Sequence, residues 1–255
     1  MQTGPFAGKS VLVTGASRGI GAATALAFAR QGARRVVIHY GSFEEGARQV
    51  VRELTAAGAE AEAIQADLGS AGGIHAFIAR LKQAGIDFDI LVNNAGSLVG
   101  RASLAEFSES LYDRVMNLNV KSVWFITQAV VPAMVAKRAG IIVNVSSIAA
   151  RTGGGAGATV YSAAKAAVST FTKGWARELA PHGIRVNAVS PGTVDNHFHE
   201  QFSTREMLEN VIKATPAGRL GTNEEVADVI LFLSSDGARY IHGQTIEING
   251  GMFMV

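Results

Sequence analysis

Tyr161 and Lys165, four residues apart, are the pair of side chains in this sequence best suited to move a proton. They lie near the start of an alanine-rich segment that is predicted to be a helix, Val160–Ala180, and this spacing puts both side chains on one helix face. A free tyrosine has a pKa of about 10 and is a poor base at neutral pH. A nearby ammonium group would favour the phenolate and lower that pKa, which indicates a general acid or base. The same spacing also occurs by chance, as a packed ring beside a solvated amine. The pair therefore indicates catalysis only in combination with the other motifs of the chain.

Three glycines stand between a short apolar run, Ser10–Thr14, and a helical pattern, Gly19–Gln31. Gly15 permits a sharp turn, Gly19 lets the backbone approach a pyrophosphate, and Gly21 lets the helix pack closely on a sheet. The phosphates would face the helix N-terminus and its unpaired N–H groups. The spacing differs from the general dinucleotide fingerprint. The strand before the glycines and the helix after them still favour a dinucleotide site over a plain turn.

The second predicted strand, Arg35–Tyr40, ends without the acidic residue that would bind an adenosine ribose and repel a 2′-phosphate. It continues into Gly41 and Ser42, and the next carboxylate is Glu44. Arg18, in the glycine turn, lies close enough in such a fold to reach a 2′-phosphate. Both features predict NADP, with NAD as the less favoured cofactor. The alternative is that Arg18 is only solvated and the cofactor preference weak.

Short β-branched runs alternate with longer amphipathic stretches along the whole chain. The predicted strands are Ser10–Thr14, Arg35–Tyr40, Ala59–Ala66, Phe88–Val92, Gly140–Val145, Ile184–Ser190 and Thr245–Asn249. The predicted helices are Gly19–Gln31, Phe43–Ala57, Gly72–Ala84, part of Ser103–Ala136, Val160–Ala180 and Asn223–Ser234. This order predicts an α/β fold, a Rossmann-type doubly wound sheet of seven mostly parallel strands with helices on both faces. The stretch Gly192–Leu220 lacks a clear pattern and is too long for an ordinary connection, which indicates a substrate-binding loop.

Composition limits the class of protein. With 255 residues, of which 48% are hydrophobic, the chain can bury one core, and we expect a single domain over residues 1–255. The net charge of +2, without a basic run that includes aromatic residues, argues against nucleic acid as a partner. The absence of cysteine excludes disulfides and thiolate chemistry. Without a signal peptide or an apolar stretch of about 18 residues, we expect a cytoplasmic protein that does not bind membranes.

Five short motifs fall at or just beyond the C-terminal ends of predicted strands, the edge where ligands bind in a doubly wound sheet. They are Gly15-x3-Gly19-x-Gly21, Asn93-Asn94-Ala95-Gly96, Ser146-Ser147, Tyr161-x3-Lys165 and Pro191-Gly192. This ordered set resembles the short-chain dehydrogenase/reductase family in its single-domain form, and the resemblance covers essentially the whole chain. It implies an enzyme that transfers a hydride between a nicotinamide cofactor and a carbonyl or secondary alcohol.

The resemblance implies four catalytic residues, Asn119, Ser147, Tyr161 and Lys165. Tyr161 would exchange the substrate proton, and Lys165 would lower the tyrosine pKa and bind the nicotinamide ribose. Ser147, in preference to Ser146, would orient the carbonyl. Asn119, in preference to the asparagine two residues before it, would hold a water that relays protons to the lysine.

The resemblance also implies the residues around the cofactor. Asp67 and Leu68 would contact the adenine, segment 93–96 the adenosine ribose, and segment 191–194 the carboxamide. The full predicted set is Gly15, Ser17, Arg18, Gly19, Ile20, Gly21, Tyr40, Gly41, Ser42, Asp67, Leu68, Asn93, Ala95, Gly96, Tyr161, Lys165, Pro191, Gly192, Thr193 and Val194. Asn196 stands where the family often has threonine. No metal is expected, since His197 and His199 lack further partners at ligand spacing.

The substrate is the least determined part of the prediction. The chain is similar to 3-oxoacyl-(acyl-carrier-protein) reductases and to sugar, polyol and ketone dehydrogenases. After Gly96 it continues as Ser97–Arg101, which departs from the stretch typical of the carrier-protein reductases. We therefore expect an NADP-dependent carbonyl reductase, with an NAD(P)-dependent sugar or polyol dehydrogenase as the alternative. A non-catalytic dinucleotide-binding regulator usually lacks the tyrosine or lysine, and an enoyl reductase spaces them more widely. The apolar end, Met252–Val255, and the family pattern predict a homotetramer.

Overall fold

The seven strands form one sheet in the order β3-β2-β1-β4-β5-β6-β7 in the computed structural model, which describes residues 4–255. Every pair of neighbouring strands is parallel. The strands are β1 (Ser10–Val13), β2 (Arg35–Tyr40), β3 (Glu60–Gln65), β4 (Ile90–Asn93), β5 (Gly140–Val145), β6 (Ile184–Pro191) and β7 (Thr245–Ile248). The order changes direction between β1 and β4, and the C-terminal ends of strands on either side of such a point form a ligand-binding crevice.

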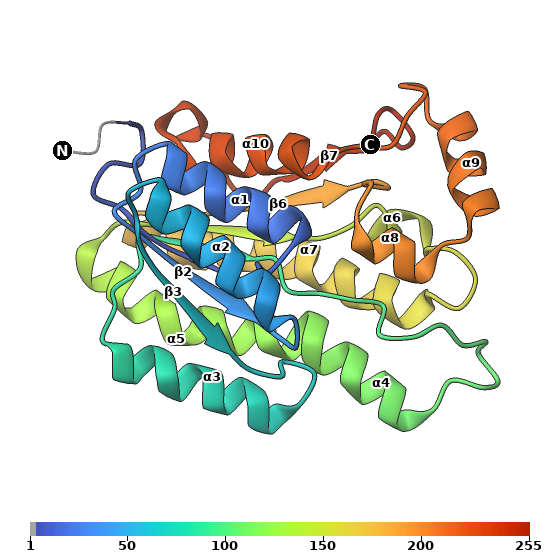
Figure 1. The fold of residues 1–255 in the computed structure, drawn as a ribbon, viewed down its shortest axis with the longest axis horizontal. Helices are drawn as coiled ribbons and strands as arrows, with labels where there is room; N and C mark the ends of the chain where they lie inside the picture. The colour runs from blue at the N-terminus through green and yellow to red at the C-terminus, as the bar shows by residue number, and fades with distance from the viewer. Residues whose placement is uncertain (1–3) are drawn as a thin grey trace.

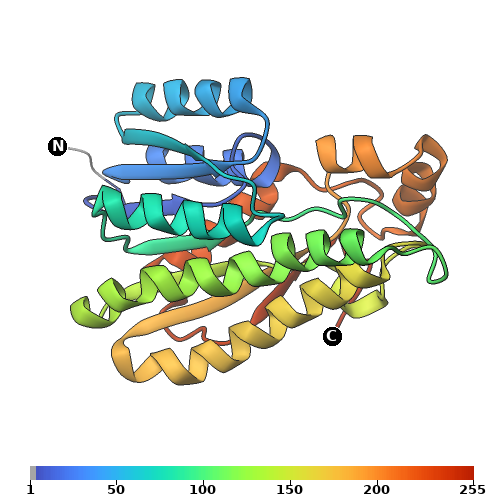
Figure 2. The same cartoon turned by 90° about the horizontal axis from the view of Figure 1, so that it is seen from below.

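Helices cover both faces of this sheet, as predicted (Figures 1 and 2). One face carries α1 (Gly19–Arg30), α2 (Glu44–Ala56) and α10 (Asn223–Ser234). The other carries α3 (Ala71–Ala84), α5 (Ser122–Lys137) and α7 (Thr159–Leu179). The remaining helical segments are α4 (Glu109–Met116), α6 (Ala149–Thr152), α8 (His197–Phe202), α9 (Arg205–Ala214), a π-helical turn (Asn117–Lys121) and two 3-10 turns (Ala180–His182 and Asp236–Ala238).

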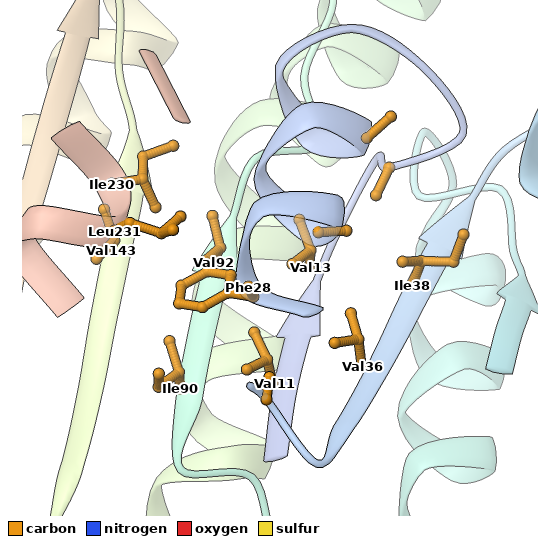
Figure 3. Packing of buried hydrophobic residues seen from close by; sticks show 14 of the residues in the cluster. Val11, Val13, Phe28, Val36, Ile38, Ile90, Val92, Val143, Ile230 and Leu231 are labelled. Atoms are coloured by element: carbon orange, nitrogen blue, oxygen red, sulfur yellow. The ribbon is translucent and has the colours of Figure 1, made fainter. Parts of the chain in front are cut away.

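Two hydrophobic cores lie on either side of the sheet because successive strand residues point to opposite faces. In β1, Val11 and Val13 pack with Phe28 of α1, whereas Leu12 packs with Phe77 of α3. Figure 3 shows the first core, where strand residues converge on Phe28. All five side chains are fully buried, and burying one side chain of this kind stabilises the fold by about 1.5–3 kcal/mol. The strand ends are thereby held in fixed positions.

The helical pattern predicted within Ser103–Ala136 begins only at Glu109, because the side chain of Ser108 accepts a hydrogen bond from the Leu111 N–H (3.2 Å) and caps the helix there. From Glu109 to Lys137 the helix is continuous, and it is long and apolar enough to cross a membrane by length and composition alone. No such stretch was expected from the sequence. Its apolar residues pack against the sheet in the second core, as in the core helix of a globular domain.

The segment 192–220, which we expected to be an irregular loop, contains the two helices α8 and α9, so the expectation of an irregular loop is wrong, while its role in binding substrate stays a prediction. The side chain of Asn196 caps α8 by accepting the Phe198 N–H (3.1 Å), and that of Thr204 caps α9 by accepting the Met207 N–H (3.2 Å). The helices are short and amphipathic, which explains the weak pattern. Figures 1 and 2 place them at the same end of the molecule as the start of α7.

Candidate active site

The glycine turn connects β1 to α1 and is packed too tightly for larger residues. Gly15 (φ +65°) and Gly19 (φ +62°) adopt left-handed backbone conformations. A Cβ on Gly21 would collide with the carbonyl oxygen of Gly15, so this glycine lets the helix lie against the strand end. The side chain of Asn94 donates to the carbonyls of Thr14 and Gly15, both at 2.9 Å, and thereby ties the turn to the segment after β4.

The first turn of α1 presents backbone N–H groups that no side chain caps. Arg18 is the N-cap residue and makes no capping hydrogen bond, whereas Ser70 and Thr222 cap α3 and α10. A Cβ built on Gly19 would meet no atom closer than 3.7 Å, so the space above it is open. Uncapped donors at the positive end of a helix dipole fit a pyrophosphate. Ser17 and Ile20 lie in the same turn and are half-buried.

Arg18 projects beyond the end of β2. Its guanidinium lies over the ring of Phe43, 5.0 Å from the ring centroid, where the cation and the aromatic face attract each other. Tyr40 is half-buried, and Gly41 and Ser42 are exposed beside it. The interaction with Phe43, which the sequence analysis did not include, holds a positive charge next to this exposed turn.

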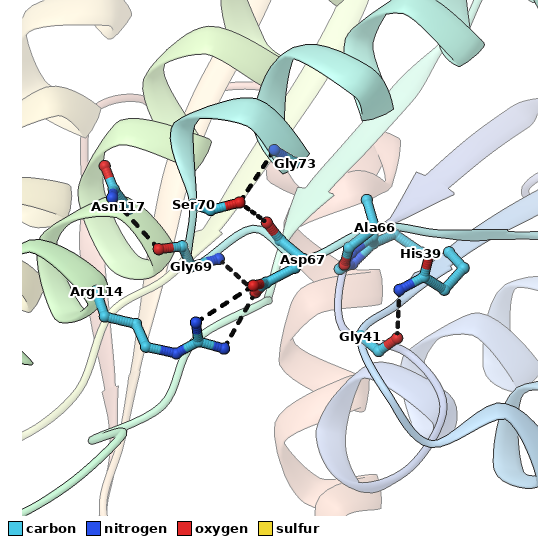
Figure 4. Close-up of polar contacts among 10 residues, drawn as sticks. His39, Gly41, Ala66, Asp67, Gly69, Ser70, Gly73, Arg114 and Asn117 are labelled. Carbon is cyan, nitrogen blue, oxygen red and sulfur yellow. Dashed lines mark hydrogen bonds and ion pairs between the residues drawn. The ribbon is translucent and has the colours of Figure 1, made fainter.

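On the adenine side of the predicted site, Asp67 follows β3 and is held from two directions (Figure 4). Its carboxylate accepts hydrogen bonds from Arg114 of α4 at 3.2 and 3.3 Å and from the Gly69 N–H at 3.0 Å. Leu68 was expected beside the adenine, but its side chain is 2% exposed and belongs to the second core. Only its main chain faces this loop. The sequence analysis missed Arg114, which lies 47 residues from its partner.

Asn93, the last residue of β4, and Ala95, two residues further along, both point into the fold. Asn93 was expected to line the cofactor, but its side chain is 2% exposed and donates to Thr127 (3.0 Å) and Asn144 (2.9 Å) inside the fold. It therefore joins β4 to β5 and α5 and stabilises the sheet. Ala95 is buried against the glycine turn, where a Cβ on Gly15 would lie 2.7 Å from its Cα.

The two serines after β5 have different surroundings. Ser146 is 3% exposed, and its hydroxyl bonds to the Lys165 carbonyl (2.9 Å) and to Ser169 (2.7 Å). Ser147 is half-buried and its hydroxyl hydrogen-bonds to the phenol of Tyr161. Ser147 is thus the serine that can share a substrate oxygen with the tyrosine.

Lys165 is 3% exposed and donates from Nζ to the Val145 carbonyl at 2.8 Å. Its Nζ lies 5.8 Å from the centroid of the Tyr161 ring. Burial lowers the pKa of Lys165 to about 8. Burial also raises the pKa of Tyr161 to about 12, and the hydrogen bond from Ser147 opposes this shift. We expected the pKa of Tyr161 to be lowered by the nearby lysine, and this expectation is wrong. Burial removes water from the phenolate, and this effect on the pKa is the largest one.

Asn119 lies in the π-helical turn and is fully buried. Its amide donates to the carbonyls of Ser97 and Val115, both at 2.9 Å, and its oxygen accepts the Ser97 N–H at 3.2 Å. The side chain is therefore occupied by backbone partners. A Cβ on Gly96 would lie 2.7 Å from Nζ of Lys165 and 2.8 Å from Oδ1 of Asn119, so the asparagine, the lysine and this glycine meet at one point.

The turn after β6 is fixed by backbone contacts. Gly192 donates its N–H to Ile248 of β7 (2.8 Å), and the Pro191 carbonyl accepts the N–H of Ile148 (2.9 Å). Val194 is 3% exposed and forms a β-bridge with Gly221, while Thr193 is half-buried between these anchors. The main chain of this turn is therefore held at the same sheet edge as the serine and the tyrosine.

The helix α8 lies over the tyrosine. Phe198 packs its ring 6.0 Å from that of Tyr161. Arg101, from the loop after β4, donates to the carbonyl of Phe202 (3.1 Å) and to that of Ala156 (2.7 Å), and so bridges α8 and the loop before α7. The sequence analysis identified neither residue as part of the site. Both contacts join segments far apart in the chain, and neither belongs to a motif.

The two histidines of α8 make local contacts. His197 lies 3.2 Å from Glu200, and His199 lies 3.1 Å from Ser203. Burial lowers the pKa of His199 to about 4, so it is neutral at physiological pH. Within residues 4–255 no group of three or more acidic or histidine side chains is placed to bind a metal.

Comparison with known proteins places this geometry in a family. A family model described as "Enoyl-(Acyl carrier protein) reductase" matches residues 15–253. The 3-oxoacyl-[acyl-carrier-protein] reductase FabG of Staphylococcus aureus is 41% identical over 246 residues, which cover 96% of this chain and 98% of that relative. The protein of the same name from Thermotoga maritima is 41% identical over 245 residues, again 96% and 98%.

Solved structures agree with this result. A protein from Beutenbergia cavernae, described as an NAD(P) dependent gluconate 5-dehydrogenase with bound NADP at low occupancy, has a TM-score of 0.90 and 35% identity over 98% of this chain and 99% of that chain. The NADH-dependent reductase A1-R′, responsible for alginate metabolism, has a TM-score of 0.87 and 34% identity over the same shares. With its parallel sheet and the group of Ser147, Tyr161 and Lys165 at one edge, the chain belongs to the short-chain dehydrogenase/reductase family and is an oxidoreductase that acts on carbonyl or alcohol groups.

Proposed function

We propose that this protein is an NADP-dependent carbonyl reductase whose preferred substrates are 3-oxoacyl thioesters. The observation that carries the proposal is the geometry at the sheet edge, where the hydroxyls of Ser147 and Tyr161 lie together and Nζ of Lys165 lies 5.8 Å from the centroid of the tyrosine ring. Two neighbouring hydroxyls can both hydrogen-bond one substrate oxygen, and the phenol can transfer a proton to it, as carbonyl reduction requires. The names of the relatives from Staphylococcus aureus and Thermotoga maritima support the choice of substrate.

The cofactor would lie along the edge formed by the glycine turn and the ends of β2, β4 and β6. Its pyrophosphate would meet the uncapped N–H groups of α1, and a 2′-phosphate would meet Arg18 beside Ser42. The neighbour with bound NADP supports this choice. Another neighbour is named as NADH-dependent, so the Kd values of NADPH and NADH need to be compared directly. When bound, the cofactor supplies a hydride to the carbonyl carbon.

Side chains of the protein would stabilise the developing charge and supply the proton. The hydroxyls of Ser147 and Tyr161 would donate hydrogen bonds to the carbonyl oxygen and stabilise the negative charge that develops there. Tyr161 would then transfer its proton to that oxygen. Lys165, held by the Val145 carbonyl, keeps a positive charge behind the tyrosine at neutral pH. Asn119, which meets Lys165 beside Gly96, would hold the water from which the proton is replaced.

The test is NADPH oxidation with three substrate classes: a 3-oxoacyl thioester, a simple ketone and a keto sugar acid. We expect the thioester to have the highest kcat/KM, and Tyr161→Phe to lose at least about 100-fold in kcat, the usual contribution of a positioned acid. Equal turnover by Tyr161→Phe would refute the assignment and favour a non-catalytic, dinucleotide-binding regulator. A tighter Kd for NADH than for NADPH would refute the proposed role of Arg18.

A sugar or polyol dehydrogenase is the second candidate, because two structural neighbours are named for gluconate and alginate metabolism. A higher kcat/KM for the keto sugar acid than for the thioester in the same assay would favour it. Arg101 is exposed and reaches α8, the helix over Tyr161, and in this second candidate its guanidinium would pair with the substrate carboxylate. Loss of the sugar-acid activity alone in Arg101→Ala would identify that contact.

We further propose that residues 1–255 act as one catalytic domain, with segment 192–220 binding the substrate, and that the protein is a cytoplasmic homotetramer. Several large apolar side chains are exposed in the single chain, among them Trp124 (41%), Met254 (77%) and Val255 (86%). Contact with neighbouring subunits would bury such groups. Light scattering should give about four times 26.6 kDa, and a monomer at working concentration would contradict the proposal.

A further inference from the structure

His39 is buried at the cofactor-binding edge of the sheet and uses both of its ring nitrogens. It is the second-last residue of β2 and is 3% exposed. Nδ1 accepts the N–H of Gly15 at 3.1 Å, and Nε2 lies 3.0 Å from the carbonyl oxygen of Ala66. Because Nδ1 accepts, the ring proton resides on Nε2 and is donated to Ala66. The ring also meets Phe77 of α3 edge-on, with 4.9 Å between centroids.

These two contacts join the segments that follow β1 and β3. Gly15 is the first glycine of the turn that leads into α1 and has a left-handed φ of +65°. Ala66 immediately precedes Asp67, the carboxylate held by Arg114. Since β2 lies between β1 and β3 in the sheet, the imidazole reaches the ends of both neighbouring strands from the strand between them.

We propose that His39 is a positioning residue for the cofactor, which sets the glycine turn and the adenine-side loop at a fixed separation through one neutral imidazole. Burial lowers the pKa of His39 to about 4, so the ring is neutral at physiological pH, as the contact in which Nδ1 accepts the Gly15 N–H requires. A neutral imidazole can accept from one backbone group and donate to another on the opposite side of the ring. The residue touches no reacting atom, so its effect should fall on cofactor binding and not on the chemical step.

A series of substitutions separates the two contacts. In His39→Asn the amide oxygen can replace Nδ1 toward Gly15, but the side chain is too short to reach Ala66. In His39→Leu both backbone groups lose their partner while the apolar volume is retained. His75→Gln, on the exposed side of α3, is the matched control.

The readout is the Kd of NADPH by fluorescence titration, together with kcat and the KM of the carbonyl substrate at saturating NADPH. We expect the Kd to rise by about tenfold in His39→Leu, with a smaller rise in His39→Asn and none in His75→Gln, since a lost net hydrogen bond of about 1.4 kcal/mol is a factor of ten. The kcat and the carbonyl KM should stay within about twofold of the wild type. An unchanged Kd in a folded His39→Leu, or a loss confined to kcat, would overturn the proposal.

Nitrogen-15 NMR of the wild-type histidine provides a second test that does not depend on the variants folding. We expect a neutral ring with the proton on Nε2 at pH 7; a proton on Nδ1 would contradict the Gly15 contact. The inference rests on the proposed cofactor site, and the two fail in different ways. If wild-type protein does not bind NADPH, the proposed function fails, whereas wild-type binding that is unaffected by His39→Leu refutes only the role of the histidine.

Discussion

Replacing Gly96 by alanine tests whether Lys165 and Asn119 must meet at the place that the structure gives them. The backbone at Gly96 does not adopt a left-handed conformation, so the effect of the substitution is steric. The new Cβ would lie 2.7 Å from Nζ of the lysine and 2.8 Å from Oδ1 of the asparagine. Ordinary contact begins at 3.4 Å, so each group must move by about 0.6–0.7 Å, or the backbone after β4 must move instead.

A displacement of this size matters because Nζ of Lys165 has a defined position. It donates to the Val145 carbonyl at 2.8 Å and lies 5.8 Å from the centroid of the Tyr161 ring. A misplacement of about 1 Å at a catalytic group can cost about 100-fold in rate. We therefore expect Gly96→Ala to lose between about 10- and 100-fold in kcat/KM for the carbonyl substrate, with about 1–3 kcal/mol of lost stability from overpacking.

The assay is NADPH oxidation at saturating cofactor, with the Tm measured on the same preparation. Gly72→Ala is the control, because a Cβ there meets no atom within 4 Å and the residue lies at the exposed start of α3. The control should keep wild-type kcat/KM. A folded Gly96→Ala protein with wild-type kcat/KM would refute the reasoning, since it would show that the lysine and asparagine tolerate a different arrangement.

Four further outcomes follow from the contacts. Ser147→Ala should lose about 10²–10³-fold in kcat, whereas Ser146→Ala should lose about 1–3 kcal/mol in a denaturant titration and little activity. The rate of carbonyl reduction should fall as the pH rises through about 8, because Lys165 then loses its charge while the tyrosine stays protonated; a rate that is flat to pH 10 would contradict this. Arg101→Ala should raise the carbonyl KM more than it lowers kcat and should speed amide hydrogen exchange in α8, as measured by mass spectrometry. Because the folded pKa of His39 (about 4) lies below its free value of 6.5, the free energy of unfolding should decrease as the pH falls from 6.5 to 4, by about 3 kcal/mol, and His39→Asn should remove most of that slope.

The sequence was sufficient to predict the strands and the helices that cover the two faces of the sheet, because the periodicity of apolar residues is local information. The strand Arg35–Tyr40 and the strand Gly140–Val145 have the predicted bounds. Ser147 was preferred over Ser146 on family grounds, and the structure supplies a physical difference, since one serine faces the tyrosine and the other is bonded into α7. The parallel sheet followed from apolar strands without polar alternation.

What the sequence could not provide depends on distance and burial. The pKa of Tyr161 was expected to be lowered because the lysine is near, but the loss of hydration, which has no signature in a motif, is the larger effect. The side chains of Asn93 and Leu68 point into the fold, and a motif alone does not tell on which side of a strand end a side chain lies. The bridge from Arg101 to α8 spans 101 residues in the chain, so no local pattern marks it.

The π-helical turn at Asn117–Lys121 has a consequence for anyone who aligns or redesigns this chain. A π turn holds one more residue than an α turn, so it changes the phase of everything after it by about 100° relative to an uninterrupted α-helix. The residues of α4 and α5 therefore do not share a continuous heptad register, although the helix runs unbroken from Glu109 to Lys137. Deleting a single residue within the turn would shift the phase of α4 relative to α5 by the same angle, although every remaining residue would keep its identity.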